Sequence, residues 1–139
     1  MLPTAKANID DIHAAVPEAF RAAVDLSVLA DYEKIQLEGE PDLIVELIDL
    51  YLEDAPRRVA AMQESLAGRN WQLVKREAHS LQGSSGNVGA FQIAQICAEI
   101  EGLDFEKLCP SGAALLSCLE LGLRQVRHAF LVERQRRSQ

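Results

Sequence analysis

Apolar residues recur at intervals of three and four along most of this chain, the spacing that places them on one face of an α-helix. The alternation typical of β-strands is weak. Four segments carry the helical pattern strongly. The first is predicted to begin at Pro41 and to end at Gly68, and Pro56 inside it predicts a kink within a single helix. Its inward positions are Ile44, Ile48, Tyr51, Ala55, Val59, Met62 and Leu66.

The other three segments follow after short connections. The second is predicted to start after Asn70, a residue that caps helices well, and the third runs from about Ala90 to Glu101. The fourth is expected to start near Pro110, with the stretch "LDFEKLCPSG" as the connection before it. The inward positions are Trp71, Val74, Ala78, Leu81, Ser85 and Val88 in the second segment, Ile93, Ile96, Cys97 and Ile100 in the third, and Leu116, Leu119, Leu123, Val126 and Phe130 in the fourth.

Four amphipathic helices with short connections predict an all-α fold, an antiparallel up-and-down four-helix bundle. We assign residues 25–139 to this bundle. One or two short extra helices are expected on its N-terminal side, one of them in "VLADYEKIQ" with Ser27 as its cap. Residues 1–24 form an N-terminal extension that is expected to be partly helical around "PEAFRAAV".

Composition and charge narrow the function. The length of 139 residues fits one domain, and 48% hydrophobic residues is ordinary for a globular protein. A net charge of -7 argues against binding to nucleic acid or to an anionic membrane surface. No signal peptide and no run long enough to span a membrane is present. Cys97, Cys109 and Cys118 show no CxxC pairing, which favours free thiols in a reducing compartment and a cytoplasmic location.

The stretch "REAHSLQGSSGNVGA" in the second helix has an unusual composition. Three glycines follow His79 closely, although each glycine inside a helix costs about 1 kcal/mol relative to alanine. Ala78 and Leu81 face the core, so His79 is expected at the edge of the buried face. The neighbours of His79 on the helix surface, within two turns, are Lys75, Arg76, Gln82, Gly83 and Gly86.

This arrangement suggests a nucleophile in a docking surface. Gly83 and Gly86 remove the side chains that would shield the imidazole, so another protein's backbone can come close. An unprotonated imidazole nitrogen can attack phosphorus, and Lys75 and Arg76 can help to hold a phosphoryl group. The alternative is that Gly86 and Gly89 simply end the helix. For the other histidines, His13 and His128, a solvated surface role is expected.

The string "AHSLQGSSGNVGA" resembles the pattern of histidine-containing phosphotransfer (HPt) domains, and the resemblance extends over roughly residues 25–102. It implies a four-helix bundle with His79 as the phosphoacceptor. The phosphoryl group would come from an aspartyl phosphate on a receiver domain, of a response regulator or a hybrid histidine kinase, and would pass to another receiver. The chain would act as a monomer and bind no cofactor, while Mg²⁺ would sit on the receiver. Gln82 departs from the pattern, which usually has lysine there.

Other functions remain as alternatives. No glycine-rich nucleotide loop is present, so we expect no ATP binding and no autokinase activity. A non-catalytic helical docking module for a signalling partner would share every fold feature and differ only in whether His79 takes phosphate. A metal-binding bundle is disfavoured, because the chain has no Glu-x-x-His motif and its cysteines lack zinc spacing, so no metal site is expected.

Overall fold

The computed structural model describes residues 23–138, with the side chain of Cys109 left out. The elements in chain order are the helix α3 (Leu26–Asp31), the 3₁₀ turn η1 (Tyr32–Ile35), and the four long helices α4 (Leu43–Ala67), α5 (Trp71–Asn87), α6 (Phe91–Gly102) and α7 (Phe105–Arg137). The described residues contain no strand, which confirms the all-α prediction. The predicted N-terminal extension lies outside the described residues except for its last two positions.

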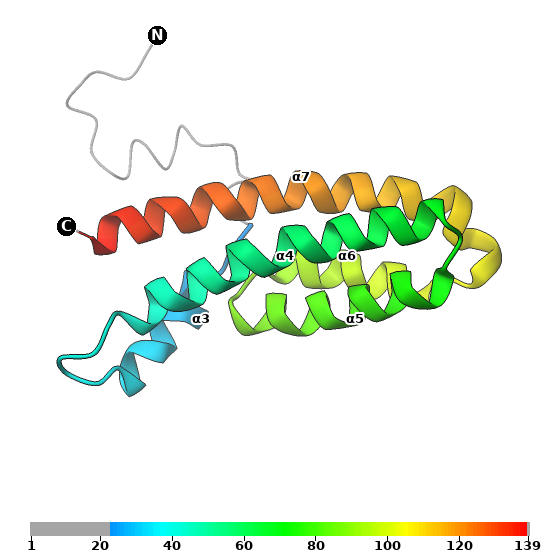
Figure 1. Cartoon of the computed structure of the whole chain (residues 1–139). Coiled ribbons are helices and arrows are strands. Elements are labelled where there is room, and N and C mark those ends of the chain that lie inside the picture. The colour runs from blue at the N-terminus through cyan, green and yellow to red at the C-terminus, as the bar shows by residue number, and fades with distance from the viewer. Residues whose placement is uncertain (1–22, 139) are drawn as a thin grey trace, which may run out of the picture.

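The four long helices form a closed bundle. The helix α4 packs against α5 and α7, and α6 packs against the same two helices. Successive helices run in opposite directions along the bundle, as the colour order in Figure 1 shows. The predicted antiparallel up-and-down topology is therefore confirmed, and α3 with η1 supplies the expected short extra elements on the N-terminal side.

Side-chain caps mark where α3, α4, α5 and α7 begin, whereas α6 begins without one. The carboxylate of Asp42 accepts hydrogen bonds from the backbone N–H groups of Ile44 and Val45, so α4 starts two residues after the predicted Pro41. The amide oxygen of Asn70 accepts from the N–H of Leu73, as predicted for α5. For α3 the prediction was wrong, because Asp25 and not Ser27 is the cap.

Pro56 and Pro110 both lie inside helices. The helix α4 continues through Pro56 as expected, and whether it bends there stays a prediction. The predicted start of α7 at Pro110 is wrong, since the helix begins at Phe105. Asp104 caps that earlier start by accepting from the N–H of Lys107 at 3.1 Å. Pro110 costs α7 one backbone hydrogen bond, which the cap and the burial of Leu108 offset.

The core lies along the centre of the bundle and contains the predicted stripes. Tyr51 meets Phe130 edge to face, with ring centroids 5.7 Å apart, and its hydroxyl lies 2.7 Å from the Oγ of Ser85. Cys97 is fully buried, and burial raises the pKa of its thiol to about 12. The predicted inward residues are buried, apart from Leu66, Trp71, Ile96 and Leu123, which are half buried and pack against the same core.

The turn from α5 to α6 is packed against the start of α3. Gly89 has a φ of 82°, a conformation that disfavours any side chain, and a Cβ there would collide with the carbonyl of Asp25. Its own carbonyl accepts from the N–H of Asp25 at 2.9 Å. The hydroxyl of Tyr32 donates to the carbonyl of Asn87 at 3.0 Å. Gly89 therefore lies in the turn that ends α5, as the alternative interpretation held for it, whereas Gly86 lies inside α5 and the alternative is wrong for that glycine.

Gly89→Ala is expected to destabilise the protein. The left-handed backbone costs a residue with a Cβ about 1–2 kcal/mol, and displacement of the Asp25 carbonyl adds to that cost. Gly83→Ala is the matched control: its Cβ would enter open space, so helix propensity should raise the free energy of unfolding by up to about 1 kcal/mol. Urea unfolding followed by circular dichroism measures both, and equal stability of the two variants would contradict the packing described at Gly89.

Candidate functional site

His79 lies near the middle of α5 and projects into solvent. Its side chain is 73% exposed, whereas Ala78 and Leu81 on the same helix are fully buried. The ring therefore lies further out than the edge position that the apolar stripe predicted. A protruding imidazole is accessible to a group held in a recess of another protein.

Glu101 lies beside the ring. Its Oε1 is 2.8 Å from Nδ1 of His79, and its side chain, in the last turn of α6, is 36% exposed. The other ring nitrogen, Nε2, makes no hydrogen bond with any residue in the range 23–138. Sequence reasoning missed Glu101, because it lies 22 residues away in sequence and only the packing of α6 against α5 brings it here.

The surface beyond His79 is built from small residues. A Cβ at Gly83 or Gly86 would meet no atom of a neighbouring element within 4 Å, so both positions are open. The helices α5 and α6 are antiparallel, and the contact between His79 and Glu101 shows which of their residues lie opposite each other. Ala98 and Ala94, three and seven residues before Glu101, lie on the same side of α6 as that glutamate. We call this region the α5–α6 face, made up of His79, Gln82, Gly83, Gly86, Ala94 and Ala98.

The predicted cations are only partly available to this face. The Nζ of Lys75 lies 5.1 Å from the centroid of the Phe105 ring, at the start of α7, so this ammonium group already has an aromatic partner. Arg76 is exposed and forms no ion pair with the described part of the chain. Gln82 is half buried. Of the two cations, Arg76 is therefore the one without a partner in the structure.

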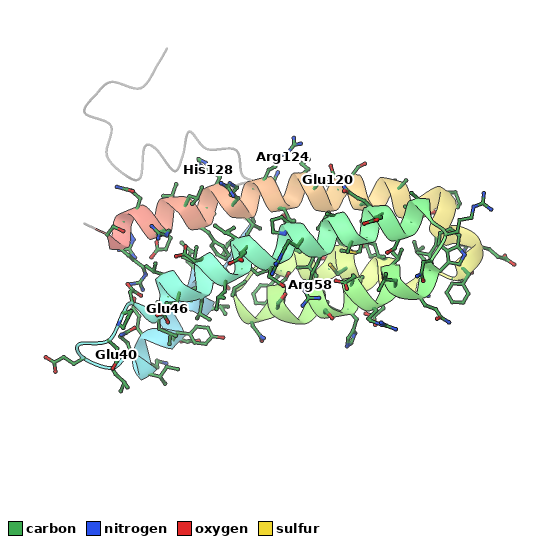
Figure 2. All side chains as sticks on the ribbon, in the orientation of Figure 1. Glu40, Glu46, Arg58, Glu120, Arg124 and His128 are labelled. Carbon is green, nitrogen blue, oxygen red and sulfur yellow. The ribbon has the colours of Figure 1, made fainter. Side chains whose placement is uncertain are left out.

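Another cation near α5 is neutralised. The guanidinium of Arg58 donates to Asp54 at 2.7 Å and to Glu77 of α5 at 3.0 Å, and Figure 2 shows it between α4 and α5. Its hydrogen bond to Asp54 is the main cause that raises the pKa of Arg58. Arg58 therefore ties two helices together and is not free to hold a phosphoryl group.

Within residues 23–138, no three histidine, cysteine, aspartate or glutamate side chains are grouped so that they could hold a metal ion. Over the same residues, no helix combines the length and the apolar character that a membrane crossing needs.

Comparison with known proteins places the chain among phosphotransfer proteins. It is 28% identical over 96 residues to histidine-containing phosphotransfer protein 5 of Arabidopsis thaliana, a match that covers 66% of this chain and 58% of that protein. It is 28% identical over 74 residues to histidine-containing phosphotransfer protein 2 of the same plant, covering 51% of this chain and 47% of that protein. The chain thus spans less than two thirds of the length of these curated relatives.

Two solved structures of histidine phosphotransfer proteins have the same fold as this chain. Histidine-containing phosphotransfer protein B (HptB) from Pseudomonas aeruginosa PAO1 superposes with a TM-score of 0.69 at 28% identity, over 82% of this chain and 96% of that one. The HPT domain of a sensor hybrid histidine kinase from Shewanella shares the fold, with a TM-score of 0.64 at 19% identity over 83% of this chain and 96% of that one. The model of the family described as the Hpt domain matches residues 46–129, more than half of the chain and inclusive of His79, and this protein therefore belongs to the Hpt family of histidine phosphotransfer domains in two-component signalling.

Proposed function

We propose that this chain is a phosphorelay intermediate. His79 accepts a phosphoryl group from the aspartyl phosphate of one receiver domain and passes it to an aspartate of another. The observation that carries this proposal is the exposed His79 ring on the open α5–α6 face, inside the region that matches the Hpt family. The partners are receiver domains of response regulators or hybrid histidine kinases.

The chemistry demands little of this chain beyond a nucleophile in the right place. Phosphoryl transfer between two proteins depends mainly on in-line positioning and on charge stabilisation of the transferred group. The receiver brings the Mg²⁺ that neutralises the phosphoryl oxygens, and this chain brings an imidazole on a rigid helix. Rigidity comes from the fully buried Val74, Ala78 and Leu81, which fix α5 in the bundle.

The α5–α6 face suits a docked receiver. Glycines and alanines beside His79 let the partner's backbone come close enough for its aspartate to reach Nε2. The site lies wholly on two helices of one bundle, so the proposed working form is a monomer. The proposed location is the cytoplasm, where thiols stay reduced, and Cys97 and Cys118 are both free in the structure.

The test is to mix the chain with a phosphorylated receiver and Mg²⁺ and to follow the label on both proteins. Relay function predicts that label leaves the receiver and appears on this chain in an acid-labile, alkali-stable form, and that a second receiver then removes it. A chain that binds the receiver but never takes label would be a docking module instead.

Gln82→Lys should shift the phosphoryl equilibrium toward this chain. Residue 82 lies one turn after His79, where a lysine would make a charge-assisted contact with the phosphoryl group that glutamine cannot make. An exposed pair of this kind contributes roughly 0.5–1 kcal/mol, which corresponds to a shift of about two- to fivefold. The measurement is the fraction of label on each protein at equilibrium.

The salt dependence of this shift identifies its cause. An exposed charge pair is screened, so the gain from Gln82→Lys should shrink as ionic strength rises. A gain that is insensitive to salt would mean that residue 82 acts through docking geometry. No gain at low salt would mean that Arg76, the cation without a partner in the structure, already supplies the charge.

A further inference from the structure

Lys75 and Phe105 contact each other about one helical turn away from His79. The Nζ of Lys75 lies 5.1 Å from the centroid of the Phe105 ring, which is within the range of a cation–π interaction. Lys75 lies four residues before His79 on α5, and Phe105 lies four residues after Glu101, the residue that contacts the His79 ring. The two contacts therefore lie next to each other along the same side of α5.

The ammonium group of Lys75 can reach a phosphoryl group on His79. Residues four apart on a helix have Cβ atoms about 5–6 Å from each other, and a lysine carries its charge on a flexible four-carbon stem. The side chain of His79 is 73% exposed, so a phosphoryl group on its ring would stand in solvent beside Lys75. Lys75 can therefore change partners by rotation about its own side-chain bonds, without movement of either helix.

We propose that Phe105 is a positioning residue for Lys75, which holds the ammonium group over its ring while His79 is unphosphorylated and releases it to the phosphoryl group once His79 is phosphorylated. This inference rests on the proposed relay function. Phe105 and the phosphoryl group then compete for one cation. The strength of the contact between Lys75 and Phe105 therefore limits how far Lys75 stabilises the phosphorylated form. No covalent bond forms or breaks in the exchange.

The two partners attract the ammonium group to different degrees. The ring of Phe105 is uncharged and 51% exposed, and it attracts a cation only through its quadrupole. A phosphoryl group is negatively charged and presents oxygen atoms that accept charge-assisted hydrogen bonds. Lys75 therefore moves to the phosphoryl group when one is present, and the contact with Phe105 that it gives up reduces the net gain.

Lys75 is the cation beside His79 that such an exchange can involve. Lys75 forms no ion pair within residues 23–138, so its contact with Phe105 is the one that it would give up. Arg76, beside it, has neither an ion pair nor an aromatic partner in the described part of the chain. Arg58 is already paired with two carboxylates. Substitutions of Phe105 therefore report on Lys75 alone.

Two substitutions of Phe105 with opposite expected effects test the inference. Leucine is apolar but has no aromatic ring, so Phe105→Leu should shift the phosphoryl equilibrium with a receiver toward this chain. The expected shift is about two- to fivefold, the effect of a cation–π contact at an exposed site. Tryptophan is the best aromatic partner for a cation, so Phe105→Trp should shift the equilibrium toward the receiver. The measurement is the fraction of label on each protein at equilibrium.

Lys75→Gln provides the control background. Without the ammonium group, neither substitution of Phe105 should move the equilibrium. A merely structural role of Phe105 at the start of α7 would act equally with and without the lysine, and it would not change direction between leucine and tryptophan. Shifts that persist in Lys75→Gln would overturn the inference, and so would shifts in the same direction for both substitutions.

A second measurement follows Lys75 directly and needs no receiver. In the unphosphorylated chain, the ring current of Phe105 should move the NMR signal of the ε-methylene protons of Lys75 upfield, and Phe105→Leu should remove this displacement. Phosphorylation of His79 with phosphoramidate, a small-molecule phosphoryl donor, should remove it as well.

The NMR result separates this inference from the relay itself. An ε-methylene signal without an upfield displacement, or one that does not respond to phosphorylation of His79, would overturn the role of Phe105 even if receivers exchange label with the chain. If the signal responds to phosphoramidate while no receiver transfers label, then the relay function has failed and the exchange of Lys75 between its two partners stands.

Discussion

Replacement of His79 by glutamine is expected to abolish phosphoryl uptake and to leave the fold intact. Glutamine has no nucleophilic nitrogen, so the N–P bond cannot form at this position. The side chain of His79 is largely exposed and its pair with Glu101 lies at the surface, so the free energy of unfolding should change by about 0.5 kcal/mol or less. Label transfer from a phosphorylated receiver and urea unfolding measure the two effects.

His128→Gln provides the control for this variant. His128 is an exposed histidine on α7, labelled in Figure 2, and α7 does not carry the α5–α6 face. This variant should take up label at the normal rate. Undiminished labelling of His79→Gln would contradict the assignment of His79 as the phosphoacceptor. Loss of labelling in both variants would indicate a general disturbance of the bundle.

Gly83→Leu is expected to slow transfer by about 100-fold or more. The position is open in the free protein, so the leucine side chain fits without a clash in the bundle and should raise helix propensity by up to about 1 kcal/mol. The same side chain would stand one turn from His79 and hold the receiver away from the ring. A misplacement of about 1 Å between reacting groups is enough for a loss of this size.

Two further variants separate docking from other causes. Gly83→Ala adds only a methyl group and should retain most of the transfer rate. Ala113→Leu adds bulk at an exposed position of α7, away from the α5–α6 face, and should transfer normally. If Gly83→Leu transfers at the normal rate, the receiver does not dock over this glycine. Loss of folding in Gly83→Leu would contradict the open surroundings seen at the site.

The helices could be predicted from sequence because their signals are local. The apolar stripe of α5 places Val74, Ala78 and Leu81 inward, and all three are fully buried. Asn70 was recognisable as a cap from its own chemistry and its place before the stripe. The topology followed in turn, since connections this short leave consecutive helices antiparallel.

Two features could not be predicted from the sequence and became visible only in the structure. The start of α7 was misplaced because Pro110 is a strong local signal for a helix start, whereas the cap at Asp104 and the burial of Leu108 outweigh the hydrogen bond that the proline costs. Glu101 was missed because the side of α6 that faces His79 depends on the register between two helices. That register is set by packing along the whole bundle and has no signal at residue 101 itself.

The most direct test of the account is to locate the phosphoryl group after transfer. The chain is incubated with a phosphorylated receiver and Mg²⁺, separated from it, digested at alkaline pH and analysed by mass spectrometry that preserves phosphohistidine. The account predicts one modified peptide, with the phosphoryl group on His79, which disappears after brief acid treatment. A phosphoryl group on any other residue, or a chain that stays unmodified while the receiver retains its label, would contradict it.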